Sequence, residues 1–200
     1  MSDTYYVKTF GGLEITNDNV TVNIVELFGK QLVNLLQVLL FHSEKPVQKD
    51  ELIDILWPES KNPSSALKFS IFRLRAELNE IEFFKDKEVI VTTRKGYILN
   101  PNLDWNIDFV ELEKAYNQIN DGSELLDEKE FKTARKIFRL YQGRFYASPS
   151  QLHWILQKQE IFRQMYVKTM MRTSCYLYTQ KRYDEMMLMN YQAVLIEPFN

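Results

Sequence analysis

The pattern of apolar and polar residues changes from strand-like alternation to helical spacing within the first sixty residues. Alternation around Tyr6, Leu13–Ile15 and Val20–Ile24 predicts three short antiparallel strands. Leucines at helical spacing then predict a helix over about 32–39, and a second helix is predicted from about Lys49 to Trp57. The start of the chain is therefore expected to be a mixed α and β domain.

A third amphipathic helix is predicted over residues 64–79. Asn62 is expected to cap it with its side chain, and Pro63 to occupy the first helical position, where its missing N–H costs nothing. One stripe is apolar and is expected to be buried: Leu67, Ile71, Leu74 and Leu78. The opposite face is polar and aromatic: Ser65, Lys68, Phe69, Phe72, Arg73 and Arg75.

Residues 89–99 predict a β-hairpin that follows this helix. Gly96 supplies the backbone freedom that a tight turn needs, and Arg94 and Lys95 stand at the tip. No acidic residue occurs from Val89 to Leu103. A helix followed by a basic hairpin has the form of a winged helix-turn-helix DNA reader.

The second half changes to an almost wholly helical pattern after a turn-rich linker at residues 100–106. The predicted helices are Ile107–Asn120, Asp127–Tyr141, Ser150–Thr179 and Tyr183–Ile196. Four residues match small, large, small and terminator positions of a tetratricopeptide unit: Ser174, Leu177, Ala193 and Pro198. We therefore expect an α+β winged-helix domain over 1–102 and an all-α tetratricopeptide-like domain over 103–200. About three repeats are usually needed for stability, so we expect the chain to be a fragment of a longer protein.

The composition is that of a soluble protein with a formal net charge of −2, so DNA contact must come from local clusters of cations. No signal peptide or membrane-spanning segment is evident, and the single cysteine excludes an intrachain disulfide; we expect a cytoplasmic protein.

His42, His153 and Cys175 lie in separate elements, and no glycine-rich phosphate loop is present. No catalytic residues, cofactor, metal or enzymatic activity are therefore expected. Cys175 is expected to be a small buried packing group.

Several segments together resemble the Streptomyces antibiotic regulatory protein family, in which an OmpR-type winged helix precedes a bacterial transcriptional activator domain. The segments that carry the resemblance are Pro46–Trp57, the Arg73–Arg75 triplet, Thr93–Tyr97, Leu140–Phe145, Trp154, Tyr183 and Ala193–Pro198. The resemblance implies a transcriptional activator whose third helix enters the major groove and whose hairpin touches the backbone or minor groove. It implies double-stranded DNA as partner, with RNA polymerase binding or self-association through the helical domain. The nucleotide-binding motif of some relatives is absent, because Gly29-Lys30 lacks the Walker spacing.

The residues predicted to contact DNA are Ser65, Lys68, Phe72, Arg73, Arg75, Thr93, Arg94 and Lys95. Arginine can read guanine edges with two hydrogen bonds, and an apolar ring can contact a thymine methyl group. In the alternative, the cations form a solvated face, paired with Glu77 or Glu80. Phe69 is expected to pack on the hairpin or the preceding helix. The rival function is a protein-interaction scaffold that does not read DNA, which the acidic net charge and an aromatic surface favour.

The aromatic and methionine residues of the second half have two interpretations. They form the shared core of stacked helices, or they line a concave or dimer-forming surface. We expect the core to account for most of them.

Overall fold

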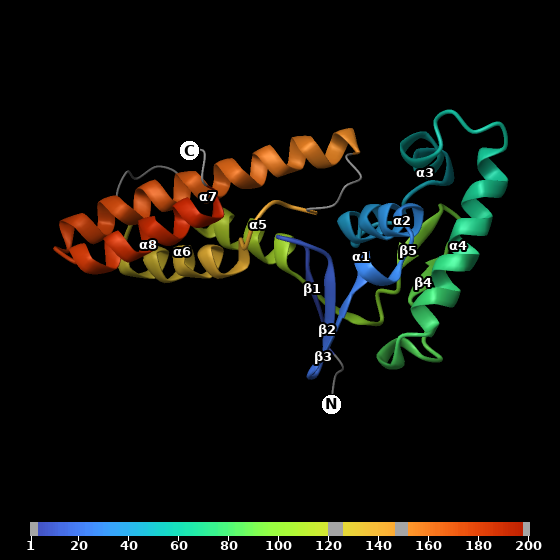
Figure 1. Cartoon of the computed structure of the whole chain (residues 1–200), viewed down its shortest axis with the longest axis horizontal. Coiled ribbons are helices and arrows are strands. Elements are labelled where there is room, and N and C mark those ends of the chain that lie inside the picture. Colours follow the sequence, from blue (N-terminus) through green and yellow to red (C-terminus); the bar gives the residue numbers. More distant parts are fainter. Residues whose placement is uncertain (1–3, 120–125, 147–151, 198–200) are drawn as a thin grey trace. The chain divides into compact units, whose positions relative to one another are not determined.

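The computed structural model describes residues 4–119, 126–146 and 152–197, which form two compact units (Figure 1). Unit 1 comprises the described residues of Met1–Val7 together with Glu14–Trp105. Unit 2 comprises Lys8–Leu13 and the described residues of Asn106–Asn200. The predicted succession of an α+β winged helix and an all-helical region is confirmed. The boundary at residue 102 stays a prediction.

A four-stranded sheet starts the fold, with the strand order β3-β2-β1-β6. Its strands are β1 (Thr4–Lys8), β2 (Glu14–Asn17), β3 (Val20–Asn23) and β6 (Asp104–Ile107). β2 and β3 pair antiparallel from Glu14–Asn23 to Asn17–Val20, so the first three predicted strands are confirmed. The expectation of a linker over 100–106 is wrong in part, because β6 begins there. Its alternating stretch is short and follows turn-forming residues, so the sequence pattern hides it.

Three helices pack against one another in unit 1: α2 (Lys30–Phe41), α3 (Lys49–Leu56) and α4 (Pro63–Asn79). They confirm the three predicted helices, while the short helix α1 (Ile24–Leu27) and the 3-10 turn Glu82–Phe84 were not predicted. Each of the four apolar stripe residues of α4 is at most 3% exposed, as predicted. The predicted side-chain cap is wrong: Asn62 stands at the capping position, but its side chain makes no capping hydrogen bond. Instead its carbonyl accepts from the Ala66 N–H at 3.1 Å, and Pro63 opens the helix.

The predicted hairpin is present as β4 (Ile90–Thr92) and β5 (Tyr97–Leu99), paired antiparallel. A residue from a distant loop extends it. The Val47 N–H donates to the Tyr97 carbonyl at 2.8 Å, and the Tyr97 N–H donates to the Val47 carbonyl at 3.0 Å. The hairpin is therefore attached to the loop that precedes α3.

Unit 2 is built from α5 (Asp108–Gln118), α6 (Glu128–Leu140), α7 (His153–Thr179) and α8 (Tyr183–Ile196). Each packs against the next along the chain, as Figure 1 shows for α6, α7 and α8. All four predicted helices are confirmed. The predicted ends at Asn120 and Ser150 and the terminator Pro198 lie outside the described residues. In the last hairpin Leu177 and Ala193 are buried, and the Ser174 hydroxyl donates to Asn190 Oδ1 at 2.7 Å.

The segment Lys8–Leu13 is joined to unit 2 by a buried carboxylate. Asp108 Oδ2 accepts from the backbone N–H of Thr9 at 2.7 Å and of Phe10 at 3.1 Å, and Oδ1 accepts from the Thr9 hydroxyl. Burial raises the pKa of the Asp108 carboxyl, although these hydrogen bonds oppose the shift. The Tyr146 N–H donates to the Thr9 carbonyl at 2.7 Å. Nothing in the local sequence pattern of Lys8–Leu13 indicates this attachment.

The prediction that Cys175 is a buried packing group is wrong. The thiol-bearing residue is exposed, because it faces outward from α7 while its neighbours Thr173 and Leu177 turn inward. Within the described ranges, no cluster of three or more histidine, cysteine or acidic residues is arranged to hold a metal ion. Over the same ranges, every helix is too short or too polar to cross a membrane.

Candidate nucleic-acid interface

The outward face of α4 carries most of the predicted contact residues. Ser65, Lys68, Phe72 and Arg73 are all exposed, as expected for a face that is turned away from the leucine stripe. The first turn of α4 contains no acidic residue, so its positive end is not neutralised locally. This face therefore offers cations and an aromatic ring to a partner.

Phe69 is part of this face as well. The expectation that it packs on the hairpin or on the preceding helix is wrong, because Phe69 is 62% exposed and Phe72 is 71% exposed. Both rings point away from the core, since the leucine stripe already fills the contact with α2 and α3. Lys68 and Arg73 flank the two rings in the sequence.

Arg73 pairs with Glu77, one of the two acids that the sequence suggested. The Arg73 Nη2 to Glu77 Oε1 distance is 3.0 Å, and the two side chains are 51% and 38% exposed. An exposed pair at this spacing contributes only about 0.3–0.5 kcal/mol. A phosphate or a base edge can therefore displace Glu77 at small cost.

Arg75 is engaged with the hairpin. Its Nε and Nη2 donate to the Ile90 carbonyl at 3.1 and 2.8 Å, and Nη2 also donates to the Thr92 hydroxyl at 2.8 Å. The guanidinium of Arg75 thereby connects α4 to β4. These hydrogen bonds use three of its five N–H donors, so only the two N–H groups of Nη1 are left for DNA.

The tip of the hairpin is a turn organised by Thr93. Its hydroxyl accepts from the N–H groups of Lys95 at 3.2 Å and Gly96 at 3.1 Å, and it lies 3.1 Å from the Gly96 carbonyl, to which it donates. Thr93 is therefore half-buried within the turn, whereas Arg94 and Lys95 are exposed. The turn presents two cations and uses the threonine hydroxyl internally.

Gly96 cannot be replaced at this turn without moving backbone. Its φ is +152°, and a Cβ added there would lie 1.8 Å from the Val47 carbonyl oxygen. The missing side chain permits the close pairing of Val47 with Tyr97.

The structure thus brings the predicted residues of α4 and of the hairpin into one unit, with Arg75 joining the two elements. It adds Lys49, whose ammonium lies 6.0 Å from the centre of the Tyr97 ring. Lys49 is exposed at the start of α3 beside the hairpin, and only the tertiary contact indicates its place there.

Comparison with known proteins bears on this region. Residues 25–99 match the family described as transcriptional regulatory protein, C terminal. The match begins in α1 and ends with β5, so it includes α4 and the whole hairpin.

The fold of the chain is similar to that of Mycobacterium tuberculosis EmbR, solved in complex with a low-affinity phosphopeptide. The TM-score is 0.65 at 15% identity, over 99% of this chain and 51% of that one. The chain thus spans about half the length of the EmbR chain. The DNA-binding domain of Escherichia coli CadC gives a TM-score of 0.37 at 24% identity, over 50% of this chain and 92% of that one. No curated protein matches the chain.

Proposed function

We propose that this chain, whose residues 25–99 form an OmpR-type winged-helix domain of transcriptional regulatory proteins, reads duplex DNA in a sequence-specific manner. In this proposal α4 enters the major groove and the β4–β5 hairpin contacts the adjacent backbone or minor groove. One observation carries it: three hydrogen bonds from Arg75 join α4 to the hairpin, so the two elements present their cations side by side.

The predicted residues take different roles in this proposal. Lys68 and Arg73 contact phosphates or base edges from α4, and Ser65 donates a hydrogen bond near the start of the helix. Arg94 and Lys95 contact phosphates from the hairpin tip. Arg75 and Thr93 act as positioning residues, because the structure commits their polar groups to the hairpin.

The regulatory output that we propose is activation of transcription. The helical unit would serve it by binding RNA polymerase or by pairing protomers on direct repeats. A reporter placed downstream of a selected site tests this part: deletion of the chain should lower expression. A rise in expression on deletion would identify a repressor instead.

The main experiment is selection of bound fragments from genomic DNA with the purified protein, followed by affinity measurements on the enriched site. Arg73→Ala is expected to reduce the free energy of DNA binding by about 1–3 kcal/mol. It should also relax the preference for one base at the position that Arg73 contacts. Arg94→Ala/Lys95→Ala should weaken binding to all sequences alike and reduce the salt dependence by about two phosphate contacts. Affinity is measured by fluorescence anisotropy at several salt concentrations.

Lys181→Ala is the control, since this exposed cation lies in unit 2, outside the proposed interface. The DNA-reading proposal fails if no site is enriched at low salt, or if both interface variants, like the control, leave binding unchanged. The two exposed phenylalanines would then support the rival function, a protein-interaction scaffold.

Phe72 provides a separate prediction about base readout. If its ring contacts a thymine methyl group, replacing that thymine with deoxyuridine should weaken binding by roughly 0.8 kcal/mol, about fourfold. The Phe72→Ala variant should bind both DNAs with equal affinity, because the methyl group has lost its partner. A scan of single deoxyuridine substitutions along the selected site measures this; equal sensitivity of the wild type and Phe72→Ala at every position would contradict it.

A further inference from the structure

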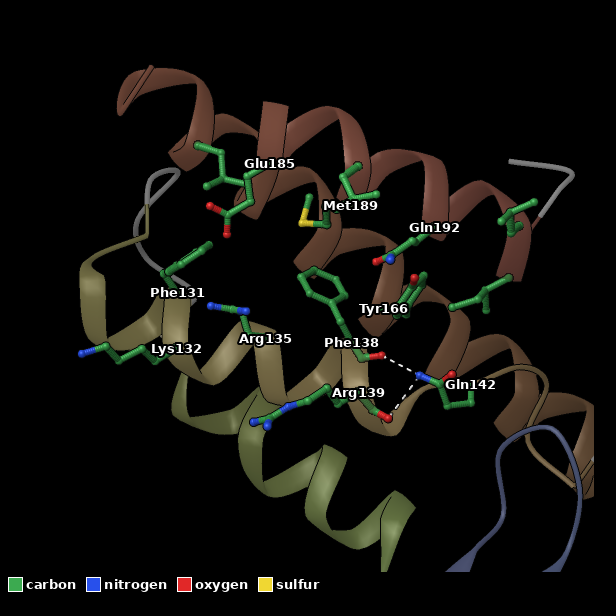
Figure 2. Close-up of a pocket in the computed structure, with 14 residues that line it drawn as sticks. Phe131, Lys132, Arg135, Phe138, Arg139, Gln142, Tyr166, Glu185, Met189 and Gln192 are labelled. Carbon is green, nitrogen blue, oxygen red and sulfur yellow. Dashed lines mark hydrogen bonds between the residues drawn. The ribbon is translucent and has the colours of Figure 1, made fainter. Parts of the chain in front are cut away.

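A cavity of about 830 Å³ lies between α6, α7 and α8 in unit 2. Figure 2 shows it with α8 above, α6 below and α7 behind. Tyr166 and Leu177 of α7 form its floor, and both are buried. Its size falls within the range of small-molecule sites, which extends from roughly 300 to 1,000 Å³.

One wall of the cavity is apolar. α8 contributes Leu188, Met189, Leu195 and Ile196, which lie at helical spacing along one face. Leu188 and Leu195 are 59% and 64% exposed, so the edge of this wall is uncovered. From Glu185 to Ile196 the lining follows about 16 Å of helix, so the space is elongated.

The other wall is cationic. α6 contributes Lys132, Arg135 and Arg139 together with two phenylalanine rings, and Figure 2 shows Arg135 and Phe138 extending from α6 into the space below α8. None of the three cations forms an ion pair with a carboxylate in the part of the chain that the structure describes. The acidic residue in the lining, Glu185, is paired with Arg182. Over the described ranges, the wall therefore carries three exposed cations that form no ion pair with a carboxylate.

We infer that this cavity binds an elongated apolar molecule with one anionic head group, a fatty carboxylate or an alkyl phosphate. The chain lies along the leucines and the isoleucine of α8, where it covers exposed apolar surface. The head group meets Arg135, whose side chain extends into the space below α8, because guanidinium forms charge-assisted hydrogen bonds with both oxyanions. Such a ligand would act as an effector, and its binding does not depend on whether unit 1 reads DNA.

The test uses the full chain and four probes below their aggregation limits: dodecanoate, dodecyl phosphate, dodecanol and dodecyltrimethylammonium. Isothermal titration should show saturable binding of one anionic probe per chain. Dodecanol and the cationic probe should bind at least about tenfold more weakly, because they lose the charge-assisted contact. The better of the two anions identifies the head group.

Matched variants locate the site. Arg135→Gln should weaken the anionic probe about tenfold, whereas Lys129→Gln, which removes the same charge elsewhere on α6, should not. Leu195→Gln should weaken all chain-bearing probes, whereas Val194→Gln, on a similarly exposed face of α8, should have no effect. Circular dichroism confirms that each variant is folded.

Two outcomes overturn the inference. If all four probes bind equally, or the paired variants do not differ, binding is unspecific adsorption to apolar surface. If neither anion binds, the cavity does not take a small amphiphile, and an acidic helix of a protein partner becomes its expected occupant.

Discussion

Replacing Gly96 with alanine is expected to destabilise unit 1 by at least about 3 kcal/mol. The added Cβ would lie 1.8 Å from the Val47 carbonyl oxygen and 2.7 Å from its carbon, and both are backbone atoms. The hairpin must therefore separate from the loop before α3, which breaks the two hydrogen bonds between Val47 and Tyr97. Urea denaturation followed by tryptophan fluorescence measures the loss of stability.

Gly29→Ala is the matched control in the same unit. A Cβ at Gly29 meets nothing within 4 Å, so its free energy of unfolding should change by less than about 1 kcal/mol. Gly96→Ala should also lose affinity for the selected DNA, because the displaced turn carries Arg94 and Lys95. Wild-type stability of Gly96→Ala would show that the hairpin does not approach Val47 as described.

The second large effect is expected for Asp108→Ala, with a loss of about 3 kcal/mol in the free energy of unfolding of unit 2. The substitution removes the acceptor for two buried N–H groups and for the Thr9 hydroxyl. Hydrogen exchange of the Thr9 and Phe10 amides, measured by NMR, should accelerate more than that of amides in α6. Asp184→Ala, at an exposed aspartate of α8, should cost less than about 1 kcal/mol; equal losses for the two variants would contradict this role of Asp108.

The pH dependence of the free energy of unfolding gives an independent test of the raised pKa of Asp108. Because burial raises its pKa, the folded chain holds this proton at pH values where the unfolded chain has released it. Its contribution to the free energy of unfolding therefore falls as pH rises from the ordinary carboxyl range through the raised pKa. Asp108→Asn should remove this part of the slope, and a slope identical to that of the wild type would argue against a raised pKa.

Much of the candidate interface could be predicted from sequence because its signals are local. The leucine stripe of α4 and the turn at Gly96 each lie within a few residues, at the spacing that their element imposes. The outward positions of Lys68 and Arg73 follow from the same spacing. The partners of a long side chain do not follow from it: Arg75 donates to Ile90 and Thr92, which the fold brings to it.

The sequence by itself determined the elements of this protein: the three helices and hairpin of the winged helix and the four helices that follow it. It could do so because periodicity and turn residues act over short distances along the chain. Only the tertiary structure decided that Lys8–Leu13 joins the helical unit, that Phe69 and Cys175 are exposed, and that α6 and α8 enclose a charged and apolar cavity. The reason is physical, since Thr9 and Asp108 are separated by 99 positions and no local pattern encodes a hydrogen bond across that distance.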